Sequence, residues 1–138
     1  MADDNQDLEN YLDSLPDKIR APLAAVIREQ AELLSAAQQN ALKALEQSPD
    51  ETGDLEASCV VVDGATDLEV FVQAGGSATT KEVREGSGVN YDYAIGFEFG
   101  TSHQPARPFF YSTYNEMRDD MQENITDALT EVLNNAGN

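Results

Sequence analysis

The sequence has few of the side chains from which catalytic and metal sites are built. Its 138 residues include one cysteine, Cys59, and one histidine, His103. A single cysteine excludes an internal disulfide and argues against a cysteine-based metal site, and a lone histidine has no second histidine with which to ligate a metal. Cys59 lies in the apolar run SCVVV, so we expect a buried small side chain rather than a reactive thiol.

Lysine and arginine are also scarce. Eight of them stand against 26 aspartates and glutamates, and the formal net charge is −18. Nucleic-acid binding depends on clustered cations, whereas these are scattered from Lys18 to Arg118. We therefore expect neither ordinary nucleic-acid binding nor attraction to anionic lipid. No apolar run approaches the roughly eighteen residues of a membrane span, and the acidic start MADDNQDLEN is unlike a signal peptide, so no membrane association and no export are expected.

The length and composition predict one folded domain over residues 1–138. Residues 1–13 are too acidic to pack well and are expected to be flexible. SLPDKI has the features of a helix start, with Ser14 as the cap and Pro16 in the first turn. Apolar residues then recur at three-to-four spacing on one face of a helix that continues to Gln47. They are Ile19, Leu23, Val26, Ile27, Leu34, Ala37, Ala41, Leu42 and Leu45.

The apolar period then changes from helical to extended. ASCVVVD and DLEVFVQA, separated by the turn-like DGAT, predict a two-stranded hairpin in which Leu68, Val70 and Val72 share a face. Residues 74–90 have no apolar period and predict a long mobile loop. In YDYAIGFEFG, aromatic and apolar residues alternate with small or charged ones, which predicts a third strand with one core face. The residues of that face are Tyr91, Tyr93, Ile95, Phe97 and Phe99.

A second helix is predicted to begin near Pro108, a residue suited to a first helical position. Its apolar stripe comprises Phe110, Tyr114, Met117, Met121, Ile125, Ala128 and Val132, and the opposite face carries Asp119, Asp120 and Glu123. The expected fold is therefore α+β: a small antiparallel sheet, made of the hairpin and a third strand, packed by a long N-terminal helix and a C-terminal helix.

No conventional catalytic signature is present, so we predict a non-enzyme with no catalytic, cofactor-binding or metal-ligating residue. His103 lies in a proline-flanked turn without a nucleophile motif, and the acidic pairs lack the spacing of a calcium loop. Glu98 and Arg107 are the charged pair that stands out, because the intervening turn can bring them together as an ion pair. The favoured role for this pair is to pin the third strand to the last helix. The alternative is contact with a neighbouring subunit.

Two segments of the chain have an unusual pattern of residues. In YAIGFEFGTSHQPARPFF, the pattern comprises Tyr93, Ala94, Glu98, Phe99, Gly100, Thr101, Pro105, Arg107, Pro108 and Phe109. In SPDETGDLEAS, it comprises Pro49, Thr52, Gly53, Leu55 and Ser58. Both segments resemble those of a phage tail-completion family that joins heads to tails in long-tailed phages of the lambdoid kind. The order and spacing of the two segments also agree with that family, so the resemblance covers about residues 15–133.

The resemblance implies a virion structural protein rather than an enzyme. The implied protein assembles in the host cytoplasm into a ring, expected to be a hexamer, in the neck of the particle. Its neighbours there are the head connector or stopper and the tail terminator or tail tube, and DNA passes nearby without specific binding. An acidic lining would let the duplex slide without sticking, a hypothesis motivated by the charge of −18. The residues expected at interfaces or in the motif are Thr52, Gly53, Leu55, Tyr93, Glu98, Phe99, Gly100, Thr101, Arg107, Pro108 and Phe109.

Two other functions are compatible with the residues. A small, very acidic protein can mimic DNA and inhibit a DNA-binding protein, in which case carboxylates should line one elongated face. An enzyme using Glu98 and Asp92 as an acid–base pair is the other alternative, since residues six apart on a strand share a face. Loss of an activity in Glu98→Gln with assembly intact would favour the enzyme.

Overall fold

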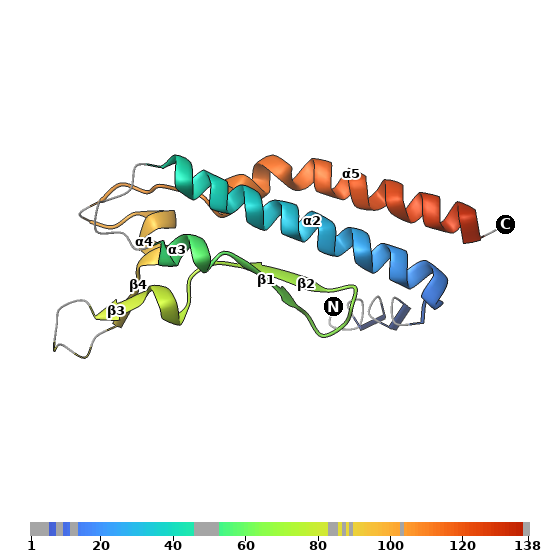
Figure 1. The fold of residues 1–138 in the computed structure, drawn as a ribbon, viewed down its shortest axis with the longest axis horizontal. Coiled ribbons are helices and arrows are strands. Elements are labelled where there is room, and N and C mark those ends of the chain that lie inside the picture. Colours follow the sequence, from blue (N-terminus) through green and yellow to red (C-terminus); the bar gives the residue numbers. More distant parts are fainter. Residues whose placement is uncertain are drawn as a thin grey trace.

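The structure is a computed structural model that describes residues 6–7, 10–11, 14–45, 53–82, 86, 88, 90–102 and 104–136. Two long helices, α2 (Asp17–Ala44) and α5 (Tyr111–Ala136), lie antiparallel and side by side (Figure 1). A hairpin of β1 (Val60–Asp63) and β2 (Val70–Gln73) lies along α2. The shorter elements gather where α2 ends and α5 begins, so the predicted α+β fold is confirmed (Figure 1).

Helix α2 begins slightly later than the sequence predicts. The position before Asp17 is Pro16, which provides no side-chain cap, and the Ser14 hydroxyl instead donates to the carbonyl of Tyr11 at 2.6 Å. The helix accommodates Pro22 in its second turn and ends at Ala44, before Gln47, which lies outside the described residues. Its buried apolar residues are Leu23, Leu34 and Leu42, all members of the predicted stripe.

The hairpin has the predicted strands and an antiparallel register in which Val61 lies opposite Val72 and Val62 opposite Phe71. Val61, Val70 and Val72 are half-buried on the side of α2, whereas Val62 and Phe71 are exposed on the outer side. Leu68 lies in the turn, outside β2, and therefore does not continue the strand face as predicted.

The third strand predicted over residues 91–99 is wrong for most of its length. Only Asn90–Asp92 is extended, as β4, and Tyr93–Phe99 forms helix α4. The Asp92 carboxylate accepts the N–H of Ala94, as a helix N-cap does, and so ends the strand. A short alternating apolar run does not by itself separate strand from helix. The helical spacing buries Ala94, Gly96, Phe97 and Glu98 and leaves Ile95 and Phe99 exposed.

Part of the predicted loop at 74–90 has regular structure. Ser77–Thr79 is a 3₁₀ turn, η1, and Thr80–Glu82 is strand β3, which pairs with β4. This pair is a separate two-stranded sheet and does not extend the hairpin. Residues 83–85, 87 and 89 of that loop, and most of the predicted flexible segment 1–13, lie outside the described residues.

The main core lies at the end of the molecule where the short elements meet. Its buried residues come from α2, from α3 (Asp54–Ala57), from α4 and from the chain just before β1 and α5: Leu42, Leu55, Cys59, Ala94, Phe97 and Phe109. Cys59 is 1% exposed, as expected, and burial together with the nearby charge of Glu56 raises its pKa to about 11. Among the described helices, none is long and apolar enough to cross a membrane.

Candidate functional site

The segment that resembles the tail-completion signature forms the joint between α4 and α5. Glu98 is buried at the end of α4, and its carboxylate accepts three backbone N–H groups. Oε2 accepts from Phe109 and Phe110 at 2.9 Å each, and Oε1 accepts from Tyr111 at 3.0 Å. These donors lie at the start of α5, where N–H groups have no partner within the helix and the helix dipole is positive. Glu98 is therefore the cap of α5, supplied by another helix.

The predicted ion pair between Glu98 and Arg107 is not among the ion pairs of the described residues. The reason is that the Glu98 oxygens are already used by the start of α5. Arg107 lies instead against Phe97: its N–H donates to the Phe97 carbonyl at 2.7 Å, and its guanidinium carbon is 3.7 Å from the ring centroid. The two residues do fasten α4 to the start of the last helix, but each does so separately.

Gly100 and Thr101 form the turn between these helices. Gly100 has φ +81°, and a Cβ there would lie 2.8 Å from the backbone nitrogen of Ala106, so both conformation and space require glycine. The N–H of Thr101 donates to the Gln104 carbonyl at 2.8 Å, and the Thr101 hydroxyl accepts the N–H of Gln104 at 3.1 Å. The turn is thereby closed on itself. His103 lies outside the described residues.

The two segments of the resemblance meet in one core. Phe109, 1% exposed, packs edge-on against Phe97 with the ring centroids 6.4 Å apart, and Leu55 belongs to the same cluster. Gly53 precedes the short helix that carries Leu55, with φ +84°. Tyr93 packs at the margin of this cluster.

Two further residues of the resemblance, Ser58 and Pro108, lie around this core. The Ser58 hydroxyl donates to the Leu55 carbonyl at 2.6 Å and accepts the N–H of Gly75 at 2.9 Å, which joins α3 to the end of the hairpin. Pro108 is exposed beside the buried Phe109. Pro49 and Thr52 lie outside the described residues, so their predicted roles stay predictions.

The outer side of the joint exposes large apolar side chains. Ile95, Phe99 and Tyr111 are 59%, 65% and 54% exposed, and the rings of Phe99 and Tyr111 lie 6.0 Å apart. They border a shallow cavity of about 340 Å³ beside β2. Because exposed aromatic side chains that lie together are common where proteins bind each other, this side of the joint is a candidate contact surface.

Asp92, whose structural role was not predicted, is the centre of a second capping network. Its carboxylate accepts the Thr79 hydroxyl at 2.5 Å, the N–H of Gly76 at 2.9 Å and that of Ala94 at 3.0 Å. Burial acts to raise the pKa of Asp92, but these hydrogen bonds outweigh it and hold the pKa below its ordinary value. Asp92 and Glu98 thus each cap a helix, which does not favour the alternative of an acid–base pair. An aspartate directly before an apolar segment was the signal for this cap.

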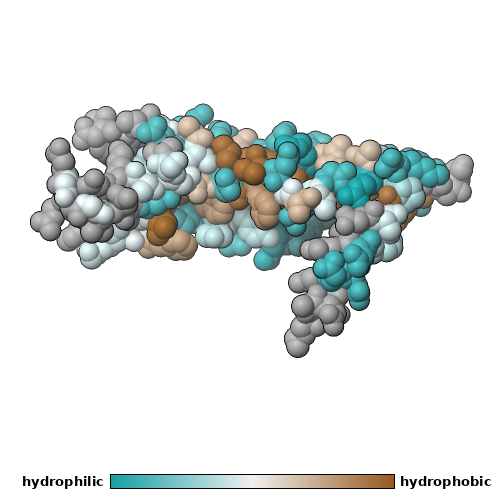
Figure 2. Space-filling view, turned by 90° about the horizontal axis from the view of Figure 1, so that it is seen from below, coloured by the Kyte–Doolittle hydropathy of each residue, from teal (hydrophilic) through white to brown (hydrophobic). Residues whose placement is uncertain are grey.

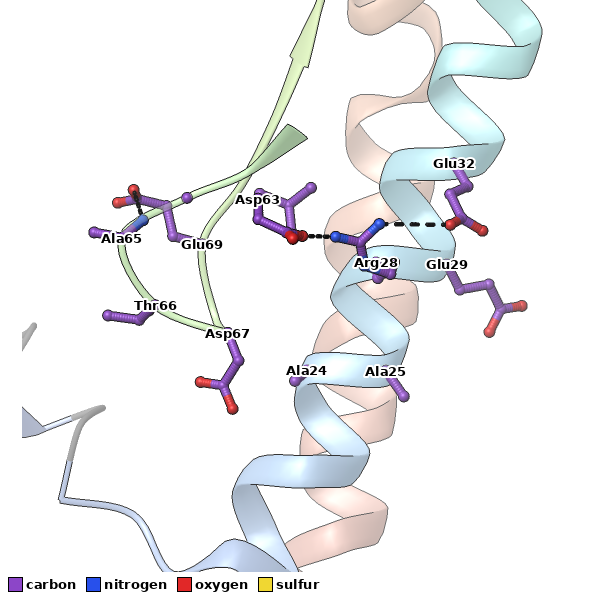
Figure 3. Close-up of a pocket in the computed structure, with 12 residues that line it drawn as sticks. Ala24, Ala25, Arg28, Glu29, Glu32, Asp63, Ala65, Thr66, Asp67 and Glu69 are labelled. Carbon is purple, nitrogen blue, oxygen red and sulfur yellow. Dashed lines mark hydrogen bonds and ion pairs between the residues drawn. The ribbon is translucent and has the colours of Figure 1, made fainter. Parts of the chain in front are cut away.

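An open acidic pocket of about 660 Å³ lies between the hairpin turn and α2 (Figure 3). Arg28 reaches from α2 to Asp63 and lies 3.7 Å from Glu32 (Figure 3). Arg20, outside that view, pairs with Asp67 at 2.6 Å. The hydrogen bond from Arg20 lowers the pKa of Asp67. These contacts tie the hairpin to α2. No cluster of three potential metal ligands occurs in the part of the chain that the structure describes.

Comparison with known proteins identifies no relative: no family model, no curated protein and no solved structure matches the chain. The resemblance to the tail-completion family therefore depends on the residues of the two segments.

Proposed function

We propose that the protein is a virion structural component, a tail-completion or head–tail joining protein that forms part of a ring in the neck of a long-tailed phage or phage-derived particle. The observation that carries the proposal is the joint between α4 and α5. Five residues of the signature each have a distinct role within the joint, although they are spread over twelve positions of the sequence. They are Glu98, Gly100, Thr101, Arg107 and Phe109. A short motif held together in this way is a determinant of the fold, and the proposal takes its residues as the basis of the resemblance.

The surface of the molecule supports a role in assembly. Large apolar side chains are exposed on two separate parts of the surface: at the joint, as Ile95, Phe99 and Tyr111, and on the outer side of the hairpin, as Val62 and Phe71. Exposed apolar side chains that lie together are common at interfaces between proteins. A ring subunit has such interfaces on two sides. Further contacts with the head connector or stopper and with the tail terminator or tail tube would use the ends of the ring.

The charge of α5 fits a subunit past which DNA moves. Its exposed carboxylates form a stripe at helical spacing: Glu116, Asp119, Asp120, Glu123, Asp127 and Glu131. If this face lines the channel, it repels phosphate and keeps the duplex from adhering. The role proposed is not enzymatic and needs no cofactor or metal.

Gene disruption followed by electron microscopy tests the proposal. We expect filled heads and finished tails that fail to join, with joining restored by a wild-type copy. Glu29→Gln, an exposed change on α2 outside the α5 stripe, is a control variant that should also restore joining. Intact infectious particles without the gene would overturn the proposed function.

The carboxylate stripe also favours a second candidate, an inhibitor that mimics DNA. From Glu116 to Glu131 the helix rises roughly 22 Å, which gives about one carboxylate every 4 Å. One strand of DNA carries a phosphate about every 3.4 Å along its axis. Pull-down of a nuclease or repressor from the source, lost at high salt, would support this candidate. Normal DNA cleavage and repression in the presence of excess protein would argue against it.

A further inference from the structure

An apolar groove of about 440 Å³ lies between α2, β2 and α5. Six of the apolar residues that line it are Ile27, Leu34, Val70, Val72, Tyr114 and Met121. Arg118, on the α5 side, is the single charged residue of the lining. The groove exists because the hairpin packs on α2 and leaves the adjacent side of α5 without a strand beneath it (Figure 1).

Two features indicate that this groove is incompletely covered. Along α5 none of the residues from 114 to 135 is buried, although the helix has an apolar stripe over that length. Gln38, which lines the groove, is 1% exposed and donates from Nε2 to the carbonyl of Phe110 at 3.1 Å, whereas its Oε1 has no partner. Buried amide oxygens normally accept a hydrogen bond, so this enclosed oxygen marks imperfect packing beside the groove, and what the groove offers a partner is apolar area.

The outer face of the hairpin exposes apolar side chains, which is the chemistry that an apolar groove can bind. Three apolar side chains point to this side: Val60, Val62 and Phe71, which are 38%, 38% and 52% exposed. We call these three residues the apolar ridge. Figure 2 views the molecule from the hairpin side and shows hydrophobic residues gathered midway along it, with hydrophilic residues on either side. Glu69, which is exposed, lies at the hairpin turn near the end of the ridge, whereas Asp63 points to the opposite side, where it pairs with Arg28 of α2.

We propose that the ridge of one copy of this chain docks in the groove of a second copy. The chemistry is complementary, because an apolar ridge with the exposed Glu69 near its end meets an apolar groove whose lining has one charged residue, Arg118, which lies 3.5 Å from Asp119 of its own helix. Ridge and groove are different surfaces of one molecule, so the contact is head-to-tail and repeats until rotation closes a ring. This inference deepens the proposed function and depends on it for its place in a particle.

Sedimentation velocity of purified variants tests the contact. Phe71→Glu impairs the ridge, Tyr114→Glu impairs the groove, and Leu133→Glu is the control at an exposed apolar position of α5 outside the groove. Circular dichroism first establishes that each variant is folded, which exposed positions should tolerate. At high salt the wild type and Leu133→Glu should associate as their concentration rises, whereas each of the other two should need at least about tenfold more protein.

Mixing the two impaired variants gives the decisive result. The intact ridge of Tyr114→Glu can enter the intact groove of Phe71→Glu, so the mixture should form dimers and nothing larger. A mixture that stays monomeric, variants that associate as the wild type does, or a wild type that is monomeric at every soluble concentration would each overturn the contact. The proposed function has a separate test: if joining needs the gene but Phe71→Glu restores it fully, the contact alone is wrong. If particles join without the gene, the neck function is wrong, whatever the sedimentation result.

Discussion

At the scale of single residues, Glu98 has the largest structural task in the motif because one carboxylate serves three N–H groups of another element. Glu98→Ala leaves those donors without an acceptor, so we expect the free energy of unfolding to fall by about 3 kcal/mol. Glu98→Gln keeps one acceptor oxygen and should lose about half as much. Urea unfolding measures both. Glu123→Gln should change stability by less than about 0.5 kcal/mol, and an equal loss in Glu98→Gln and this control would contradict the capping role.

Asp92 should make stability depend on pH. Its folded pKa is below the ordinary 3.8, so its stabilising effect is complete above that value and is lost as the pH falls through the folded pKa. Protonation then weakens its hydrogen bonds from Thr79, Gly76 and Ala94. In Asp92→Asn, the free energy of unfolding at neutral pH should be lower. The decrease in that free energy that protonation of Asp92 causes at acid pH should be missing. Urea unfolding at a series of pH values, with exposed Asp120→Asn as control, measures the difference. Parallel curves for wild type and Asp92→Asn would refute it.

At the scale of elements, the long helices and the hairpin were predictable because their periodicity extends over many residues. The apolar stripe from Ile19 to Leu45 has the spacing of a helix and cannot be interpreted as a strand. The segments VVVD and VFVQ are separated by a turn, which indicates a hairpin. Residues 93–99 were not predictable in this way. Their alternation fits a strand, and what selects the helix lies elsewhere in the chain: the donors to Asp92 and the start of α5, which needs Glu98. The resemblance identified Glu98 and Gly100 as special residues without showing what either contacts.

The hairpin is held to α2 by ion pairs at its turn, and this attachment can be tested directly. Because the Asp63 and Asp67 carboxylates that pair with Arg28 and Arg20 are exposed, removing both arginines should change global stability little, although the Arg20 side chain is itself only 15% exposed. It should instead increase local opening of the hairpin. Hydrogen exchange should show faster exchange at β1 and β2 in Arg20→Ala/Arg28→Ala, with little change in α5. Lys43→Ala removes a cation from α2 far from the turn and is the control. Unchanged exchange in the hairpin would show that packing alone holds it.

At the scale of the whole molecule, the charge of −18 opposes any association of identical chains. The sequence established this charge, but it did not show where the apolar surface lies, because the groove depends on how α5 is placed beside the hairpin. The proposed assembly into a ring therefore requires that burial of apolar area outweigh electrostatic repulsion between the copies. The two candidate functions consequently predict opposite effects of salt on binding: on self-association of the chain in one case, and on a complex with a DNA-binding protein in the other.

Salt screens repulsion between copies of the chain, so self-association should strengthen as ionic strength rises. An inhibitor that mimics DNA binds a basic cleft by attraction between opposite charges, and its complex should weaken under the same change. Sedimentation velocity of the wild type at low and high sodium chloride measures how self-association responds to salt. The double variant Glu116→Gln/Glu123→Gln lacks two charges of the α5 stripe, so it should associate at lower salt than the wild type. Self-association that weakens with salt would mean that ion pairs, and not the apolar ridge and groove, hold the copies together.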